Sequence, residues 1–211
     1  IGESFLAEKI KEWEMNLPAN IKLAYLPSPE ALRLRLTIKG DDKESLHKTI
    51  QAHENKLSEI IDEYIFGFDR QTMPEILGNL LRSKGKTIST AESCTGGNIA
   101  RLITSVPGSS AYFAGSLVAY SNQIKERILH VKPEDLNKYG AVSEQVVKAM
   151  ASNAREFFNT DFSIATSGIA GPDGGTEQKP VGTVWIAIAD KQQVTARKYT
   201  FTSDRDINIR R

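Results

Sequence analysis

The sequence predicts an α/β protein of two parts, in which a small α+β domain precedes a three-layer α/β/α domain. In residues 74–211, short apolar strands alternate with helical segments, which is the pattern of a sheet covered by helices on both faces. In residues 1–69, the order is instead helix, strand, strand, helix. We therefore expect domains at 1–69 and 74–211, joined by a linker at 70–73.

The small domain opens with a helix because apolar residues recur at helical spacing between charged ones. Strict alternation of apolar and polar residues then indicates a half-buried strand. The predicted elements are a helix over 2–16, strands over 21–25 and 32–38, a long helix beginning at 40–42, and a short strand at 64–66.

Arg33 and Arg35 share one face of the second strand, a pattern that could contact nucleic acid. However, residues 1–69 carry 9 Lys/Arg against 13 Asp/Glu, a net charge of −4. That sign is unfavourable for binding phosphates. We therefore expect a solvated strand face and no nucleic-acid partner.

Apolar runs and helix caps predict the helices and strands of the large domain, with Ser121 and Ser143 as two of the caps. Helices are predicted over 73–84, 98–103, 123–129, 133–139 and 144–158, and strands over 87–91, 116–120, 162–166, 183–189 and 194–202. The last two strands can form a hairpin. In such a domain, the loops that follow the strands gather at one sheet edge.

Composition limits the function. The net charge is +1, so no overall field favours nucleic acid or a membrane, and no apolar run is long enough to cross a bilayer. The single cysteine, Cys94, excludes an internal disulfide and suits a reducing compartment, so we expect a cytoplasmic protein. Because the chain opens on Ile1 and a helix has just begun before Arg211, we expect a segment of a longer protein.

The segment Thr90–Gly97 lies between a strand and a helix and holds three hydroxyls, a thiol and a carboxylate. Ser93 and Cys94 are its candidate nucleophiles. Gly96 and Gly97 leave backbone amides uncovered, and the helix start behind them would favour an anion. The sequence thus predicts a nucleophile beside an anion site.

Lys125 lies one turn into the helix that follows Tyr120, in the same strand-end context as Ser93. Serine with lysine is a known pair of nucleophile and base. A lysine base must be neutral near pH 7, whereas its unperturbed pKa is about 10.4. The alternatives are that Lys125 is a surface lysine, that Tyr120 is a core tyrosine and that Cys94 is a small buried apolar residue.

The glycine-rich segment 168–180 could wrap a phosphate with its backbone amides, or simply connect two strands. Arg205 follows the last strand and could clamp a phosphate, or lie on the surface. Glu92 could orient its loop through hydrogen bonds to the backbone. No His, Cys, Asp or Glu cluster has metal-ligand spacing, so we expect no metal and no cofactor.

Five motifs, in order, resemble the C-terminal domain of the CinA family (competence/damage-inducible protein). They are Thr90–Gly97, Val106–Ser110, Tyr120–Asn122 with Lys125, Gly168–Gly175 and Lys179–Val184. Residues 1–69 are similar to the family's middle, KH-type domain, but they contain no Gly-x-x-Gly clamp, so RNA binding does not carry over. The family's molybdopterin-binding-like domain, linked to ADP-ribose pyrophosphatase activity, has no counterpart in these residues.

The resemblance implies nicotinamide-nucleotide amidase activity, in which nicotinamide mononucleotide and water give nicotinate mononucleotide and ammonia. It implies Ser93 as nucleophile, Lys125 as base and Tyr120 as an assisting residue. The implied substrate-binding residues are Glu92, Thr95, Gly96, Gly97, Asn122, Gly168, Gly171, Pro172, Gly174, Gly175 and Arg205. Ser203 stands where the family pattern before Asp204-Arg205 has glycine.

The resemblance also implies a homo-oligomer with a pyridine nucleotide as substrate. Three alternatives stay open: a nucleotide-binding module without turnover, a DNA-associated competence factor, and an amidase that uses Cys94.

Overall fold

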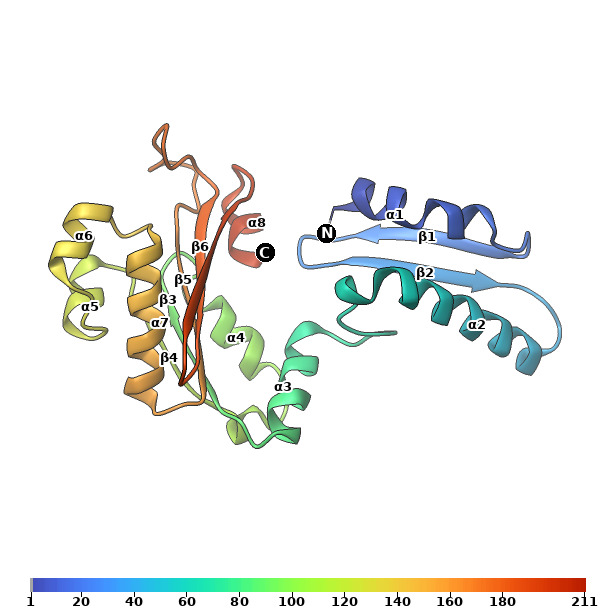
Figure 1. The fold of residues 1–211 in the computed structure, drawn as a ribbon, viewed down its shortest axis with the longest axis horizontal. Coiled ribbons are helices and arrows are strands. Elements are labelled where there is room, and N and C mark those ends of the chain that lie inside the picture. Colours follow the sequence, from blue (N-terminus) through green and yellow to red (C-terminus); the bar gives the residue numbers. More distant parts are fainter. Residues whose placement is uncertain (1) are drawn as a thin grey trace. The chain divides into compact units, whose positions relative to one another are not determined.

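The computed structural model describes residues 2–211 and divides the chain into two compact units, one ending at Arg70 and one spanning Gln71–Arg211. The first unit has the predicted order helix, strand, strand, helix (Figure 1). Its elements are α1 (Glu3–Met15), β1 (Ile21–Pro27), β2 (Leu32–Ile38) and α2 (Lys43–Ile61). The two strands pair antiparallel, with Ile21 opposite Ile38.

One face of this two-stranded sheet is half-buried against the helices. Leu32, Leu34 and Leu36 of β2 pack against apolar residues of α1 and α2. The alternate residues, Arg33 and Arg35, are exposed, as the alternation predicts.

The expected strand at residues 64–66 is wrong. Asp62–Tyr64 form a 3₁₀ turn (η1) that the Ile65 N–H closes on the Asp62 carbonyl. Tyr64 and Ile65 pack against the apolar cluster between the helices, so burial rather than strand pairing fixes this segment.

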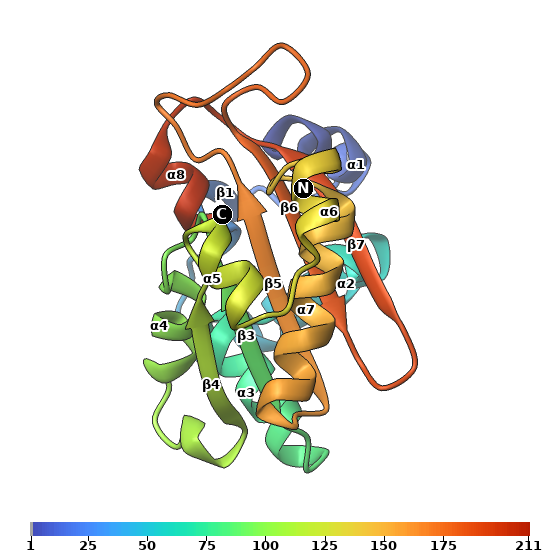
Figure 2. The same ribbon diagram turned by 90° about the vertical axis from the view of Figure 1, so that its left-hand side faces the viewer.

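The second unit is built on a five-stranded mixed sheet in the order β4-β3-β5-β6-β7 (Figure 2). The strands are β3 (Ile88–Glu92), β4 (Phe113–Val118), β5 (Phe162–Gly168), β6 (Thr183–Ala189) and β7 (Val194–Thr200). β3 is parallel to β4 and β5, whereas β5, β6 and β7 pair antiparallel. The predicted hairpin of the last two strands is confirmed.

Helices cover both faces of this sheet, which confirms the three-layer prediction. They are α3 (Met73–Ser83), α4 (Asn98–Thr104), α5 (Asn122–Arg127), α6 (Pro133–Tyr139), α7 (Glu144–Phe158) and α8 (Arg205–Arg210), with a 3₁₀ turn, η2, at Ser109–Ala111. Ser121 and Ser143 cap α5 and α7, as predicted.

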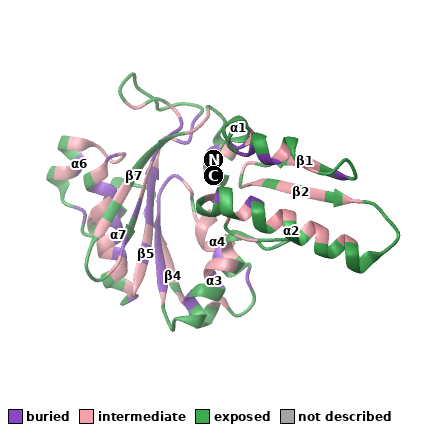
Figure 3. Ribbon diagram, turned by 45° about the vertical axis from the view of Figure 1, so that its right-hand side comes forward, coloured by how far each residue is buried: buried purple, intermediate pink, exposed green. Residues whose placement is uncertain are grey.

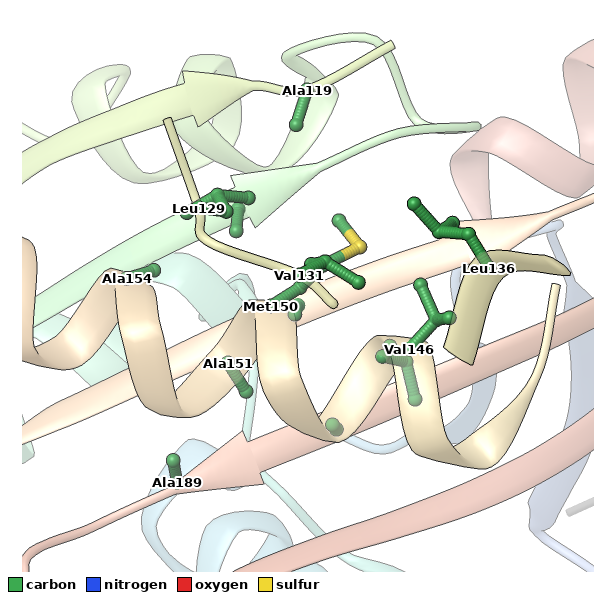
Figure 4. Packing of buried hydrophobic residues seen from close by; sticks show 13 residues of the cluster. Ala119, Leu129, Val131, Leu136, Val146, Met150, Ala151, Ala154 and Ala189 are labelled. Carbon is green, nitrogen blue, oxygen red and sulfur yellow. The ribbon is translucent and has the colours of Figure 1, made fainter. Parts of the chain in front are cut away.

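Small side chains on the sheet let α7 approach closely. Ala91, Ala165 and Ala187 are fully buried and pack with α7 in one apolar cluster. Figure 4 shows Met150 of α7 beside Leu129 and Val131 in the same cluster. A second cluster, which includes Leu81 of α3 and Ile103 of α4, covers the other face.

β3 is buried along its whole length, and much of β5 is also buried (Figure 3). Along β3, Ala91 packs with α7, whereas the next residue, Glu92, contacts the backbone of α4. Because side chains alternate between faces, Ser93 belongs to the α7 side. β3, β4 and β5 all end at one sheet edge, where β6 begins and β7 ends.

β4 begins and ends earlier than the predicted strand at 116–120. The carbonyl groups of Ala119 and Tyr120 accept hydrogen bonds from Lys125 Nζ instead of continuing the strand. This departure from the strand brings the lysine into the site.

Candidate active site

Ser93 and Lys125 meet at the sheet edge. Ser93 directly follows β3, and Lys125 lies on α5, which follows β4. Lys125 Nζ lies 3.1 Å from Ser93 Oγ, 2.9 Å from the Ala119 carbonyl and 3.1 Å from the Tyr120 carbonyl. The two residues are therefore within direct proton-transfer distance.

Lys125 is 1% exposed, although lysine is among the residues least often buried. Loss of hydration lowers the pKa of Lys125, while the negative charge of Cys94 in its ionised form would act in the opposite direction. Among the residues that the structure describes around the cavity, none is acidic, so no carboxylate counteracts this lowering.

The geometry of Lys125 suits a neutral amine. Such an amine has two N–H groups and one lone pair, and two backbone carbonyls lie within reach of its hydrogens. In the structure Lys125 Nζ donates to Ser93 Oγ at 3.1 Å, and in the neutral amine the lone pair would instead face the hydroxyl proton of Ser93. In this protonation state, Lys125 can act as a base toward Ser93.

Cys94, the rival nucleophile, is buried beside Ser93. Burial raises the pKa of its thiol to about 11, against a smaller opposing effect of hydrogen bonds and the Lys125 charge. The thiolate is the reactive form of cysteine. Near neutral pH, Cys94 is thus overwhelmingly a thiol, and the structure favours Ser93.

The helix start behind the loop is not free for an anion, contrary to the sequence prediction. Glu92 is fully buried, and its carboxylate accepts hydrogen bonds from the backbone N–H groups of Gly97, Ile99 and Ala100. It also accepts one from the Thr95 hydroxyl, at 2.7 Å. A carboxylate of the protein already occupies the anion position.

Glu92 therefore caps α4 and orients the loop, and it is not placed to contact substrate. The Thr95 hydroxyl shares a further hydrogen bond with Thr166 on β5, at 2.8 Å, so it is used within the protein. Gly96 and Gly97 have positive φ of 60° and 98°, which glycine adopts without strain. They shape the turn, and neither they nor Thr95 line the cavity.

An open cavity of about 220 Å³ lies over the Ser93–Lys125 pair. It is lined by Ser93, Cys94, Tyr120, Asn122, Lys125, Ala141, Val142, Ser167, Gly168, Ala170 and Arg205. The structure thus brings together six predicted site residues, which lie at or after the ends of β3, β4, β5 and β7: Ser93, Tyr120, Asn122, Lys125, Gly168 and Arg205.

Arg205 is held at the cavity by two hydrogen bonds. Its Nη1 donates to the Gly171 carbonyl at 2.9 Å, and its Nη2 donates to the Tyr120 hydroxyl at 3.1 Å. Tyr120 is 59% exposed and is not a core residue. Because its oxygen accepts from Arg205, its own proton remains available for a substrate group.

The glycine-rich segment is divided in its roles. A side chain at Gly168 would stand 2.8 Å from the Thr183 carbonyl oxygen and 3.0 Å from Cys94 Sγ, so close packing requires glycine there. Gly171 contributes its carbonyl to Arg205. Pro172, Gly174 and Gly175 are exposed and do not line the cavity, so in this structure they belong to the connection between β5 and β6.

The wall formed by Ala141, Val142 and Ser167 was not expected from the sequence. The Ser167 hydroxyl donates to the Ala141 carbonyl at 2.7 Å, which joins β5 to the segment before α7. The position of Ser167 at a strand end was a usable signal. Ala141 and Val142 carry no polar side chain, so nothing in their identity indicated a place in the site.

Within residues 2–211, no three His, Cys, Asp or Glu side chains are grouped closely enough to hold a metal ion. None of the helices described for these residues combines the length and apolar character that a membrane crossing requires.

The fold and site define an α/β protein with a serine–lysine pair at the strand ends of a mixed sheet. The CinA C-terminal domain model matches residues 70–211, and the model of the damage-inducible protein CinA KH domain matches residues 1–67. The chain therefore belongs to the CinA family.

Individual relatives agree with this assignment. A CinA-like protein of Cytophaga hutchinsonii is 51% identical over 210 residues, which is 100% of this chain and 50% of the relative. A CinA-like protein of Flavobacterium psychrophilum is 49% identical over 98% of this chain and 50% of its own length. The chain spans about half the length of these curated relatives.

Solved structures are also similar. The competence/damage inducible protein CihA from Agrobacterium tumefaciens is 36% identical, with a TM-score of 0.64 over 69% of this chain and 90% of that one. The competence damage-inducible protein A (ComA) from Klebsiella pneumoniae is 34% identical, with a TM-score of 0.62 over 64% and 83% of the two chains.

Proposed function

We propose that this protein is a nicotinamide-nucleotide amidase, which hydrolyses nicotinamide mononucleotide to nicotinate mononucleotide and ammonia. The observation that carries the proposal is the 3.1 Å contact between the buried Lys125 Nζ and Ser93 Oγ. Amide hydrolysis needs an activated nucleophile and a proton donor for the leaving amine, and this pair can supply both. The choice of substrate rests on the family resemblance.

In the proposed first half-reaction, Ser93 Oγ attacks the carboxamide carbon while Lys125 Nζ takes its proton. The carbon–nitrogen bond then breaks, and Lys125 returns the proton to the departing ammonia. In the second half-reaction, Lys125 accepts a proton from water as that water attacks the acyl-enzyme. Ser93 leaves and recovers its proton from Lys125.

Loop amides can stabilise the oxyanion that forms at each step. The candidate donors are the backbone N–H groups of Cys94 and Thr95, which in this structure are directed at the Cys94 sulfur. These groups directly follow the nucleophile, as the corresponding donor does in other serine hydrolases.

Arg205 and Tyr120 support the choice of an anionic, nucleotide-like substrate. Arg205 places its charge at the cavity, and its guanidinium keeps donors beyond the two that Gly171 and Tyr120 accept. We assign the phosphate of the nucleotide to Arg205, because the helix start that could have bound it is filled by Glu92.

The first test is ammonia release from nicotinamide mononucleotide by the wild type and by Ser93→Ala. We expect the variant to lose on the order of a thousandfold or more in kcat, as for other serine nucleophiles. Cys94→Ala is the matched control, and its rate should stay within roughly threefold because its thiol is protonated. Full activity in Ser93→Ala would refute the proposal, and loss of activity only in Cys94→Ala would move the nucleophile to the thiol.

The same preparations separate an enzyme from a binding module. If the wild type and Ser93→Ala both bind nicotinamide mononucleotide in calorimetry and neither releases ammonia, the domain is a nucleotide-binding module without turnover.

A further inference from the structure

Asn208 is the one buried residue that α8 is described to have, and it is only 4% exposed. It lies one turn after Arg205 on the same short helix. Asn208 does not line the cavity, so it has no direct access to a bound substrate. Its burial therefore needs another explanation, because a buried amide is costly unless its hydrogen bonds are satisfied.

The side chain of Asn208 uses its full hydrogen-bonding capacity. Its Nδ2 donates to the carbonyl oxygens of Ala170, at 2.8 Å, and Thr202, at 2.9 Å. Its Oδ1 accepts from the Thr202 backbone N–H, at 3.0 Å, and from the Thr202 hydroxyl, at 3.3 Å. Two donors and two acceptor positions are the complete set that an asparagine amide offers.

These contacts join the loop after β5 to the loop after β7. Ala170 lines the cavity, and its neighbour Gly171 holds Arg205 by its carbonyl. The two loops also touch directly, because a side chain on Gly171 would stand 3.1 Å from the Ser203 carbonyl oxygen. One amide thus connects the wall of the cavity to the segment that leads into Arg205.

We infer that Asn208 is a positioning residue, which fixes the Arg205 guanidinium at the cavity by holding these two loops together. It acts through Ala170 and Thr202 and does not touch the substrate. The inference deepens the proposed function. It rests on that function in one respect, because it takes the anion bound by Arg205 to be the phosphate of the nucleotide.

Asn208→Asp is the sharpest variant because it keeps the shape but replaces the two donors by a carboxylate oxygen; it also adds a negative charge, which the matched control adds as well. The carbonyls of Ala170 and Thr202 would then face a carboxylate oxygen, and the bridge between the loops would be broken. Asn153→Asp is the matched control. Asn153 Nδ2 also donates to a backbone carbonyl, that of Leu129, but neither residue lines the cavity.

The first readout needs no ligand. The ¹⁵N NMR signal of the Arg205 Nε–H is identified by its loss in Arg205→Lys, and its heteronuclear NOE reports the order of the guanidinium. We expect a high heteronuclear NOE for Arg205 Nε–H in the wild type and in Asn153→Asp, and a clearly lower NOE in Asn208→Asp. An unchanged NOE in a folded Asn208→Asp would overturn the inference, whatever the substrate is.

The second readout is the split between KM and kcat for nicotinamide mononucleotide. Asn208→Asp should raise KM about tenfold, the effect of losing one well-placed hydrogen bond to a charged group, with kcat nearly unchanged. In an Arg205→Ala background, the same change should add less than about twofold, because coupled residues are not additive. Equal effects in both backgrounds would show that Asn208 does not act through Arg205.

Two further outcomes are informative. If the wild type releases no ammonia, the proposed function fails, while the NMR measurement still decides the role of Asn208. If Asn208→Asp does not fold, Thr202→Val is the milder variant, since it removes the hydroxyl contacts to Asn208 and to the Asp204 N–H. Arg205 should then lose part of its order, and full order would count against the inference.

Discussion

Lys125 combines burial with two backbone carbonyl contacts and one serine contact. Burial disfavours its charged form, and so lowers its pKa from the ordinary value of 10.5. A base works only in its unprotonated form, so the lower pKa moves the onset of activity toward neutral pH.

The pH dependence of the reaction tests this directly. We expect kcat/KM for nicotinamide mononucleotide to rise about tenfold per pH unit on the acid side of the Lys125 pKa and to level off below pH 10.5. Lys125→Arg, which keeps the charge but cannot lose its proton, should be inactive at every pH. A wild-type kcat/KM that keeps rising through pH 10.5 would show that the pKa of Lys125 is not lowered, or that Lys125 is not the base.

Ser93, Lys125 and Arg205 lie at one cavity, as the sequence predicts, because each follows a strand and the strand ends of an α/β sheet converge. The role of Asn208 could not be predicted from the sequence, because its amide donates to the backbone carbonyls of Ala170 and Thr202. Ala170 is distant in sequence, and a backbone carbonyl is present at every residue. Hydrogen bonds to backbone groups leave little trace in residue identity. Their partners depend on how two loops meet.

At the level of elements, the site depends on the junction of β3 and α4. The anion prediction failed here because a strand residue, Glu92, reaches across the loop and fills the helix start. Periodicity identifies the strand and the helix, but it does not tell which side chain caps the helix. The same contacts hold the turn that carries Ser93.

Glu92→Gln tests this junction. The amide would direct N–H toward a backbone N–H or the Thr95 hydroxyl, which should lower the free energy of unfolding by about 1–3 kcal/mol. The melting temperature should fall by roughly 3–10 °C. If the cap positions Ser93, kcat should fall while KM changes little.

Glu75→Gln is the matched control, because Glu75 accepts hydrogen bonds from the N–H and hydroxyl of Thr72 at the exposed start of α3. It should cost less stability and leave kcat unchanged. If Glu92→Gln and Glu75→Gln have the same kinetics, the cap at α4 is structural only.

At the level of the whole molecule, the two units have separate cores. One apolar cluster lies entirely within the unit that ends at Arg70, and three others lie entirely within Gln71–Arg211. All described residues that line the cavity also belong to the second unit, between Ser93 and Arg205. A unit with its own core can fold alone.

We therefore expect residues 71–211, produced alone, to unfold cooperatively and to deamidate nicotinamide mononucleotide with a kcat/KM within about twofold of the whole chain. Ammonia release and circular dichroism, with Ser93→Ala in the same fragment as the blank, make the comparison. A fragment that folds but turns over much more slowly would show that the first unit contributes to catalysis. A fragment that does not fold would show that the second core depends on the first unit.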